Sequence, residues 1–339
     1  MRYTIRPDSL LERLALWTDM VPLPAIDVLV PLIKVRAIMA GVRLGIFSAL
    51  SPGPLSTGEL AARLELDAEC LRLLLRVLVS SEYLTQRDEH FALTRRASEL
   101  HAYVEFNYLQ WHFVEGLEQT LRTGRGVEFH RTLPEPSDWQ RYQHAMLDLA
   151  RPVAGTIAAH VPVPKGARRL LDLGGSHGLI GAALCRAHPP MRSTVLELPP
   201  AVAHAKQLAL DEGIADVVEH RAGDALASNY GADYDVVLLC NLLHHLSERE
   251  VGLVLLRAVE ALRGGGTIAV WETEFPRSDS KPELAGDALA LYFRITSSSP
   301  GLGPNVIEEK LRALGCEEVE TTRTLRAPGR VLLCGKRRH

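Results

Sequence analysis

The sequence predicts an α/β protein in which a doubly wound, mostly parallel sheet follows a mainly helical N-terminal region. Two patterns lead to this prediction. From Arg168 onward, short apolar runs alternate with helical segments, whereas residues 1–105 carry apolar side chains at helical spacing and end in a hairpin pattern. The length of 339 residues suits two domains with separate cores.

The C-terminal part contains the strands of the predicted sheet. Five apolar runs are expected to form strands, at residues 168–173, 193–198, 216–221, 234–240 and 267–272. The helices expected between them cover residues 178–188, 201–213 and 249–266, and the glycines at the end of the last helix should close it. Glu317–Leu325 and Arg330–Gly335 are expected to form a final antiparallel hairpin.

The first 105 residues begin with an apolar helix and continue as a compact unit. Residues 28–50 are expected to be helical, because their apolar side chains recur at helical spacing, at Val35, Ile38, Met39, Val42 and Ile46. SPGP breaks the chain after them, and Thr57 and Asp67 can each cap a following helix. QRDEHFALT suggests a short hairpin, so the order helix, turn, helix, hairpin predicts a winged helix.

A winged helix can bind DNA, or it can serve packing and dimerisation. The second helix of this unit offers Arg72 and Arg76 among many leucines and valines, and acids such as Glu69 offset their charge. DNA recognition needs an exposed helix face with base-reading and phosphate-binding side chains. We therefore expect this unit to bury its surplus apolar surface between two copies of the chain.

Composition and charge argue against several classes of function. The net charge is -3 with both signs mixed, which disfavours nucleic acid or an anionic membrane as a partner. The N-terminus lacks the apolar core of a signal peptide, and the longest apolar stretch, residues 25–47, is interrupted by Asp27, Lys34, Arg36 and Arg43. The five cysteines include no CxxC pair, so we expect a cytoplasmic protein with free thiols and no metal centre.

Residues 106–165 are rich in aromatic side chains and histidine, and we expect them to form connecting helices. Core packing between the domains explains many of these side chains. A junction between domains is also a common place for a small-molecule pocket. Trp139 and Tyr142 are therefore candidate substrate-binding residues.

The strongest local signal is LLDLGGSHG at residues 170–178, where a strand leads through a tight turn into a helix. Such a turn directs backbone N–H groups and the positive end of the helix at a bound anionic group. The spacing of Gly174, Gly175 and Gly178 differs from the G-x-G-x-x-G pattern of dinucleotide-binding turns. Asp172 would repel a pyrophosphate but favour an ammonium or sulfonium group, which indicates S-adenosylmethionine rather than NAD.

Two further acids follow later strands. Glu197 closes the second strand, where a carboxylate can accept hydrogen bonds from both ribose hydroxyls. Asp224, in AGDAL, follows the third strand, where a carboxylate can meet the adenine amino group. Each could be a solvated loop acid, but ligands of open α/β sheets bind at this edge, so acids at successive strand ends indicate one site.

The fourth strand leads into CNLLHHLSERE, which places His244 and His245 at the same edge. Histidine titrates near neutrality and can take a proton from a phenol or enol as a methyl group is transferred. Counted along the longer run YDVVLLCNLL, the first residue beyond the strand is His244, which is the candidate base. Glu272, or Glu274 on the same face, could accept its other N–H. The histidine pair could also bind a metal, but the sequence offers no third ligand at a recognisable spacing.

Taken in order, these motifs resemble those of the small-molecule O-methyltransferases. The matching segments are KVRAIMAGVRLGIFSAL, STGELAARL, LRLLLRVLVSSEYL, LLDLGGSHG, STVLELPPAV, AGDAL, LLHHLSE and VEALRGGGTIAVWETEFP. The resemblance implies a winged-helix dimerisation domain at residues 1–105, connecting helices that contribute to the substrate pocket at 106–165, and a Rossmann-like S-adenosylmethionine domain with a mostly parallel seven-stranded sheet at 166–339.

The residues and the resemblance together select the candidate site. The cofactor-binding candidates are Asp172, Gly174, Gly175, Glu197, Asp224, Ala225 and Cys240. The resemblance implies that His244 is the catalytic base and that Glu272 steers it. The substrate-binding candidates are Met146, Trp139, Tyr142 and Asn241.

The sequence departs from the family pattern at several positions near the predicted base. His245 and Leu246 stand where the family usually has Asp and Trp, and Cys240 stands where it often has Lys. Ser176 replaces a glycine of the cofactor turn, and SSPGLGPNV lacks the family's second steering acid.

The predicted activity is S-adenosylmethionine-dependent O-methylation of a small aromatic or polyketide-like metabolite by a homodimer. Two alternatives stay open at this point: a C-methylating or non-methylating enzyme on the same scaffold, and a winged-helix regulator that senses a small molecule. A nicotinamide-dependent oxidoreductase is a more distant alternative.

Overall fold

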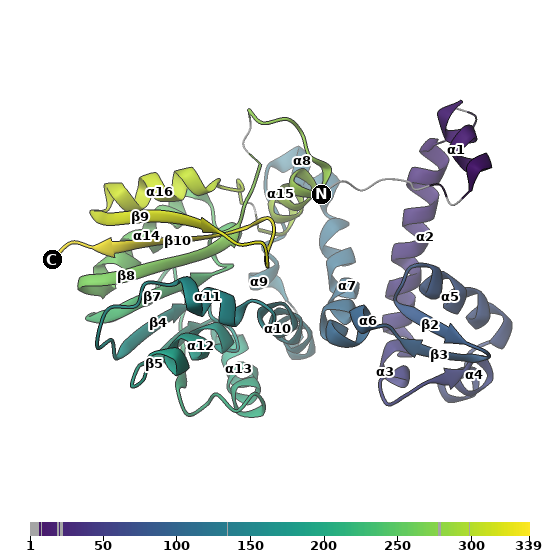
Figure 1. Cartoon of the computed structure of the whole chain (residues 1–339), viewed down its shortest axis with the longest axis horizontal. Coiled ribbons are helices and arrows are strands. Elements are labelled where there is room, and N and C mark those ends of the chain that lie inside the picture. Colours follow the sequence, from purple (N-terminus) through teal and green to yellow (C-terminus); the bar gives the residue numbers. More distant parts are fainter. Residues whose placement is uncertain are drawn as a thin grey trace. The chain divides into compact units, whose positions relative to one another are not determined.

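A computed structural model describes residues 7, 9–18, 20, 23–133, 135–276, 279–297 and 299–339 of the chain (Figure 1). Its contacts divide the chain into two compact units, residues 2–111 and 112–339, and the division lies inside helix α7 (His101–Val114). Each unit has a hydrophobic core of its own.

The N-terminal unit consists of helices around a small antiparallel sheet. The helices before α7 are α1 (Leu10–Trp17), α2 (Leu23–Arg43), α3 (Ile46–Leu50), α4 (Thr57–Leu64), α5 (Ala68–Ser80) and α6 (Arg95–Glu99). The strands are β1 (Leu55–Ser56), β2 (Leu84–Arg87) and β3 (His90–Leu93), in the order β1-β3-β2. The helices α4 and α5 and the β2-β3 hairpin follow one another as predicted, so the winged-helix prediction is confirmed.

The structure corrects two details of this unit. The predicted long apolar helix is interrupted between α2 and α3, because Gly45 has a left-handed backbone (φ 74°) that an α-helix cannot contain. The cap of α4 is Ser56 rather than Thr57, since Ser56 Oγ accepts from the Glu59 N–H while the Glu59 carboxylate accepts from the Ser56 N–H. Asp67 caps α5 as predicted, by accepting a backbone hydrogen bond.

The C-terminal unit is a seven-stranded sheet covered by helices (Figure 1). Its strands are β4 (Arg169–Leu173), β5 (Arg192–Glu197), β6 (Val218–Ala222), β7 (Tyr234–Cys240), β8 (Leu262–Thr273), β9 (Cys316–Arg323) and β10 (Arg330–Arg337). Its helices are α8 (Leu117–Thr123), α9 (Phe129–Thr132), α10 (Pro136–Ala150), α11 (Ala154–His160), α12 (Leu179–Ala187), α13 (Pro199–Asp211), α14 (Glu248–Ala261), α15 (Leu284–Ser297) and α16 (Pro304–Ala313). A short 3₁₀ turn, η1 (Leu243–His245), follows β7.

The order of the strands is β6-β5-β4-β7-β8-β10-β9. The first five strands of this order are parallel, and β10 runs antiparallel to both β8 and β9. The mostly parallel sheet and the final antiparallel hairpin are thereby confirmed. The chain order reverses beside β4, which leaves a crevice at the carboxyl ends of β4, β5 and β7, where ligands of such sheets bind.

The glycines predicted to close α14 have another role. The helix ends at Ala261, and residues 264–266 lie inside β8. Gly265 has φ 72°, and the pairing of β7 with β8 shifts register between Tyr234 and Val236. The glycines therefore allow an irregular beginning of the strand instead of ending the helix.

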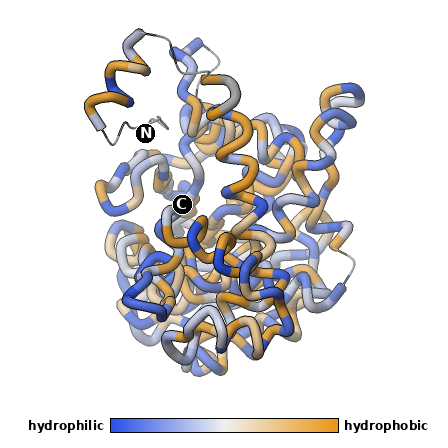
Figure 2. The backbone as a smooth tube through the Cα atoms, turned by 90° about the vertical axis from the view of Figure 1, so that its right-hand side faces the viewer, coloured by the Kyte–Doolittle hydropathy of each residue, from blue (hydrophilic) through white to orange (hydrophobic). Residues whose placement is uncertain are grey.

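Both faces of the sheet are buried by helices. Leu171 and Val237 belong to a core cluster with residues of α14 and α16, whereas their strand neighbours Leu170 and Val236 belong to a cluster with α11 and α12. Figure 2 shows hydrophobic and hydrophilic residues alternating along the helices, as expected for helices with one buried side. The packed sheet thus holds the side chains beyond its strand ends in fixed positions.

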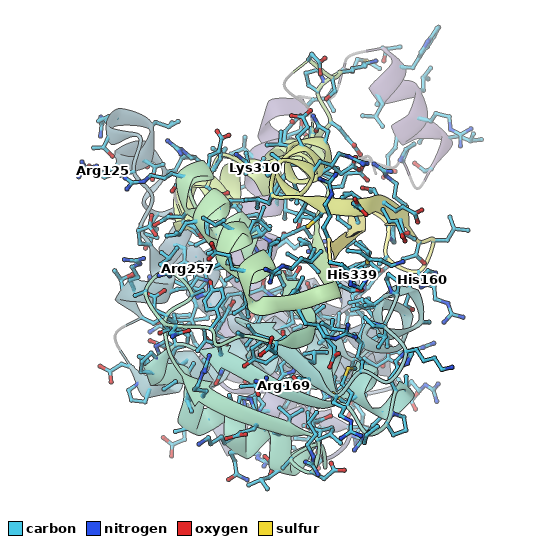
Figure 3. All side chains as sticks on the ribbon, turned by 90° about the vertical axis from the view of Figure 1, so that its left-hand side faces the viewer. Arg125, His160, Arg169, Arg257, Lys310 and His339 are labelled. Carbon is cyan, nitrogen blue, oxygen red and sulfur yellow. The ribbon has the colours of Figure 1, made fainter. Side chains whose placement is uncertain are left out.

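Basic side chains of the C-terminal unit come from several of its helices and strands (Figure 3). Those labelled in Figure 3 come from different elements, among them Arg169 on β4, Arg257 on α14 and Lys310 on α16. The guanidinium groups of Arg169 and Arg257 each donate to a backbone carbonyl, at 2.9 and 2.8 Å. In the described parts of the chain, no helix has both the length and the apolar character needed to cross a membrane.

Candidate active site

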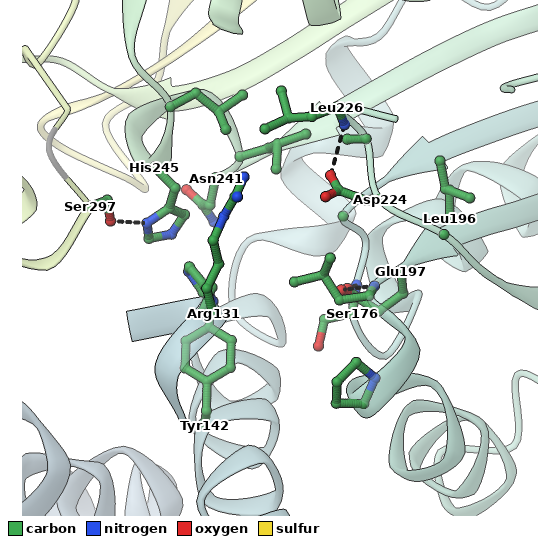
Figure 4. Close-up of a pocket in the computed structure, with 18 of the residues that line it drawn as sticks. Arg131, Tyr142, Ser176, Leu196, Glu197, Asp224, Leu226, Asn241, His245 and Ser297 are labelled. Atoms are coloured by element: carbon green, nitrogen blue, oxygen red, sulfur yellow. Dashed lines mark hydrogen bonds between the residues drawn. The ribbon is translucent and has the colours of Figure 1, made fainter. Parts of the chain in front are cut away.

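A cavity of about 300 Å³ lies at the carboxyl ends of β4, β5 and β7 (Figure 4). Its wall comes from the loops after these strands and after β6, from α9 and α10, and from η1 and the end of α15. In Figure 4, Ser176, Glu197 and Asp224 lie on one side of the cavity, and His245 and Ser297 lie on the other. All of these elements belong to the C-terminal unit.

The turn after β4 presents its backbone to the cavity. Gly174 has φ 65°, and its N–H donates to the Leu196 carbonyl at 2.9 Å. Ser176 also has a left-handed backbone (φ 49°), which explains why the related family uses glycine there. Its N–H donates to Glu197 Oε2 at 2.8 Å, and its buried hydroxyl has no hydrogen-bond partner among the described residues. The turn therefore offers an unused hydroxyl group to a ligand.

Asp172 lies beneath this turn instead of in the cavity wall. Its side chain is buried and accepts a hydrogen bond from the backbone of Gly181. A Cβ atom on Gly175 would come within 2.4 Å of this carboxyl group, so only glycine fits there. Burial and the nearby charge of Glu197 raise the pKa of Asp172 to about 7. Neither Asp172 nor Gly175 lines the cavity, and Asp172 acts on the site by supporting the turn.

Glu197 and Asp224 are brought together in the cavity wall. The two carboxylate oxygens of Glu197 accept from the backbone N–H groups of Leu198 (2.7 Å) and Ser176 (2.8 Å). Burial raises the pKa of Glu197, although both of these hydrogen bonds act in the opposite direction. Asp224 Oδ1 accepts a backbone hydrogen bond of 2.8 Å within its own loop, and Ala225 lines the same wall.

The charges around the cavity suit a cationic ligand. Four carboxylates line it, those of Glu128, Glu197, Asp224 and Glu250. Arg131 is the one arginine or lysine in the described wall. The two histidines of the wall are neutral, because burial lowers the pKa of His130 to about 3 and that of His245 well below its usual value. This negative surplus would repel the pyrophosphate of a dinucleotide and attract a sulfonium or ammonium group. The residues present therefore fit S-adenosylmethionine better than NAD.

His244 and Glu272 form a buried pair at the edge of the site. The turn η1 places His244 beside the end of β8, where Glu272 Oε2 lies 2.6 Å from His244 Nδ1. Glu272 Oε1 also accepts from the Leu243 N–H at 2.7 Å, which fixes the turn. Burial alone would raise the pKa of Glu272, but His244, Arg330 and the Leu243 N–H outweigh it and lower that pKa. The carboxylate is therefore ionised near neutral pH.

His245, the second histidine of the pair, lines the cavity, and His244 lies behind it. His245 Nδ1 lies 2.9 Å from Ser297 Oγ, and its ring centroid lies 4.2 Å from that of His130. Burial, followed by the neighbouring His130 and His244, lowers the pKa of His245. His244 packs against Phe293, with ring centroids 4.1 Å apart.

An aromatic corner closes the other end of the cavity. It contains Trp139 and Tyr142 of α10, two of the candidate substrate-binding residues, together with Phe129 and His130 of α9. The ring centroid of His130 lies 5.0 Å from that of Tyr142 and 6.2 Å from that of Trp139. Gln143 lines the cavity next to them, and neither atom of its buried amide has a partner among the described residues.

The remaining candidates divide between the wall and the interior. Asn241 lines the cavity, and its Oδ1 accepts from Arg330 at 2.6 Å. Cys240 is buried at the end of β7, and Met146 lies further along α10; neither is part of the wall as described. Glu274, the alternative partner of His244, pairs with an arginine of β9 on the surface.

Several polar residues of the wall could not be assigned to the site from the sequence. Gln143 follows Trp139 by four residues, so helical spacing could have placed the two on one face. His130 was visible only as one of many aromatic or histidine residues. Ser297 had no local signal, because its place beside His245 depends on how α15 packs against η1.

This sheet, with its acids at successive strand ends and a buried His–Glu pair, defines a Rossmann-like, S-adenosylmethionine-dependent methyltransferase. The model of the O-methyltransferase domain matches residues 106–297, and that of the O-methyltransferase dimerisation domain matches residues 28–102. The chain belongs to the O-methyltransferase family and is an S-adenosylmethionine-dependent O-methyltransferase.

Individual proteins are similar over most of the chain. The 3-hydroxy-5-methyl-1-naphthoate 3-O-methyltransferase of Streptomyces sahachiroi is 27% identical over 315 residues, which cover 88% of this chain and 90% of that protein. The mitomycin biosynthesis 6-O-methyltransferase of Streptomyces lavendulae is 29% identical over 286 residues, which cover 78% and 81%. The solved structure of the mitomycin 7-O-methyltransferase MmcR has the same fold, with a TM-score of 0.79 at 24% identity, covering 97% of this chain and all of that one.

Proposed function

We propose that this enzyme methylates a hydroxyl group of a small aromatic natural product, with His244 as the general base. The observation that carries the proposal is the His244–Glu272 pair beside a cavity with Glu197 and Asp224 on one side and aromatic rings on the other (Figure 4). Acids suit a cationic methyl donor, and aromatic rings suit a flat acceptor. One relative is named for a hydroxynaphthoate and another for mitomycin biosynthesis, which supports an acceptor of this class.

The acidic end of the cavity would hold the methyl donor. Glu197 would accept hydrogen bonds from the ribose hydroxyls, Asp224 would meet the adenine amino group, and the turn at Gly174 would lie against the methionine part. S-adenosylmethionine supplies a methyl group on a positively charged sulfur, which is a good leaving group. The protein then has to align the acceptor oxygen with that methyl group and exclude water.

His244 would remove the proton of the acceptor hydroxyl. The ionised Glu272 accepts the hydrogen at Nδ1, so Nε2 keeps the lone pair that takes up a proton. The same carboxylate stabilises the imidazolium that results. His245 is less suited to take up a proton, because burial and two neighbouring histidines lower its pKa. We assign His245 to the wall of the substrate site.

We also propose a homodimer, with residues 1–105 as the dimerisation domain, 106–165 contributing helices to the substrate pocket and 166–339 as the methyltransferase domain. The match of residues 28–102 to the dimerisation domain supports this arrangement. So do the large apolar side chains exposed on α1 and α2, which include Leu10, Leu11, Trp17, Val28, Leu29 and Ile33.

Methyl transfer to simple aromatic hydroxyls tests the proposed activity. Protein incubated with methyl-labelled S-adenosylmethionine and a panel of naphthols and dihydroxynaphthalenes should form labelled methyl ethers, detected by mass spectrometry, with NMR locating the methyl group on oxygen. Glu197→Ala should lower affinity for the donor about 10- to 100-fold, because charge-assisted hydrogen bonds to the ribose are lost. A label on a ring carbon would instead support the C-methylating alternative. Donor binding without transfer to any member of the panel would contradict an aromatic hydroxyl as acceptor.

A further inference from the structure

The aromatic corner contains polar atoms that the proposed reaction does not use. His130 Nε2 is buried and has no hydrogen-bond partner among the described residues. The same is true of both amide atoms of Gln143, whose side chain is 1% exposed. Both residues line the cavity. Buried polar atoms are nearly always hydrogen-bonded, so unpaired ones in a cavity wall indicate that a ligand supplies the partner.

These two residues lie at the acceptor end of the cavity. The His130 ring is surrounded by Phe129, Tyr142 and His245, with centroids 3.7, 5.0 and 4.2 Å away. Gln143 follows Trp139 by one helical turn, and the Trp139 ring is itself 6.2 Å from that of His130. A flat acceptor among these rings would bring its edge to the unpaired atoms.

The missing partner is a neutral group. His130 and Gln143 carry no charge, since burial lowers the pKa of His130 to about 3 and an amide does not titrate. The carboxylates that line the cavity would disfavour an anionic partner. A hydroxyl group can both donate and accept a hydrogen bond, so it can pair with the imidazole nitrogen of His130 in either tautomer. The amide of Gln143 can likewise donate to that hydroxyl group or accept from it.

We propose that His130 and Gln143 form a specificity subsite for a second hydroxyl on the aromatic acceptor, in addition to the hydroxyl that receives the methyl group. This inference rests on the proposed function and names the acceptor class as a dihydroxylated aromatic compound. A site built to hydrogen-bond a hydroxyl discriminates against an analogue without it, because its buried polar atoms are then left unpaired.

The test compares each dihydroxynaphthalene with the naphthol that lacks its second hydroxyl. For the wild-type enzyme, kcat/KM of the best dihydroxy isomer should exceed that of the matching naphthol about 10- to 100-fold. A compound with two equivalent hydroxyls to methylate would by itself react only about twice as fast. The preference should stay constant between about pH 5 and 7, because His130 does not titrate there and the aromatic hydroxyls, which ionise near pH 10, are still protonated. His130→Phe keeps a ring against Tyr142 and should reduce the preference to near two, mainly through KM, while His130→Gln should restore most of it. Gln143→Leu should reduce it as well.

His144→Phe is the matched control, since His144 lies on α10 but pairs with His204 away from the cavity, and it should leave the preference unchanged. Affinity for S-adenosylhomocysteine checks that each variant is folded. A wild-type preference near two, or a preference that His130→Phe leaves intact, would overturn the proposal while the enzyme still methylates naphthols. If Gln143→Leu weakens donor binding and keeps the preference, the two-residue subsite is wrong. Absence of transfer to every naphthol would instead contradict the proposed function, and the second-hydroxyl assignment with it.

Discussion

Two adjacent histidines in this site have opposite electrostatic environments. His244 has an ionised carboxylate 2.6 Å from its Nδ1, which accepts the Nδ1 hydrogen and leaves Nε2 as the free acceptor. His245 has a serine hydroxyl at Nδ1 and two histidine rings as neighbours, and its burial disfavours the protonated ring. A residue that takes a proton during the reaction needs a partner such as the carboxylate beside His244, although His245 is the histidine that lines the cavity.

Alanine substitutions at these two positions separate the roles. His244→Ala should lower kcat about 10²- to 10⁴-fold, the usual contribution of a general base, while His245→Ala should lower it much less. Calorimetry with S-adenosylhomocysteine should give nearly the wild-type affinity for both variants. If His245→Ala loses as much turnover as His244→Ala, or if His244→Ala keeps nearly full turnover with chemistry limiting the rate, His244 is not the base.

At the residue scale, the place of Glu197 at the edge of the sheet was predictable, because Glu197 ends β5 and the carboxyl ends of parallel strands meet at that edge. His244 was predicted as the first residue beyond its strand, but β7 ends at Cys240, and three further residues precede His244. The catalytic role of His244 stays a prediction. The carboxyl group of Asp172 lies under the turn, toward Gly175 and Gly181, which the sequence did not indicate, and its cofactor role stays a prediction. His130 could not be assigned, because its approach to His245 joins α9 to η1 across more than a hundred residues of sequence.

At the scale of elements, one carboxylate joins the end of β8 to η1. Glu272 accepts from the Leu243 N–H and pairs with His244, so the turn that carries the proposed base is held at two points. Glu274 lies two residues later on the same chain but forms a half-exposed pair with Arg323, with side chains 33% and 57% exposed. The two acids therefore provide a matched comparison of a buried and a surface interaction.

Glutamine at these two positions should have unequal effects on stability. Glu272→Gln should lower the free energy of unfolding at pH 7 by about 1–3 kcal/mol and reduce turnover, because it removes a buried charge-assisted pair. Glu274→Gln should cost less than about 1 kcal/mol. Urea unfolding and steady-state rates measure both. Equal losses from the two variants would show that Glu272 does not hold the turn.

The pH dependence of the Glu272→Gln effect follows from the lowered pKa of Glu272 in the folded protein. The carboxylate's contribution is fully present above the ordinary carboxyl pKa of about 4.3 and is lost as the pH falls through the lower folded value. The difference in stability between wild type and Glu272→Gln should therefore be constant near neutrality and shrink in acid.

Most strands were predictable because a buried parallel strand is a short apolar run, as in residues 234–240.

The structural role of a glycine was harder to predict from the sequence. Gly45 ends α2, whereas Gly265 lies within the irregular start of β8, and both have a positive φ. A sequence shows that a glycine permits such a backbone, but whether a helix or a strand uses it depends on tertiary pairing.

At the scale of the whole molecule, the N-terminal helices carry more apolar surface than their own unit covers. The helix α1 has a capping box between Ser9 and Glu12, yet no side chain of this helix is buried in the structure as described. Short helices are marginal in water without packing of an apolar face. Leu10, Leu11 and Trp17 are each about 80% exposed, so a partner surface is needed to stabilise this helix.

A second copy of the chain is the partner that the dimerisation domain implies. Sedimentation at micromolar concentration should give about twice the chain mass of 37.3 kDa. Replacing Leu11 and Trp17 together by serine should shift the protein toward the monomer, because each exchange removes apolar area from the interface. Leu325→Ser changes a fully exposed leucine of the C-terminal unit, in the loop after β9, and should leave the dimer intact. A wild-type protein that sediments as a monomer would reject the homodimer, and a double variant that stays dimeric would place the interface away from α1.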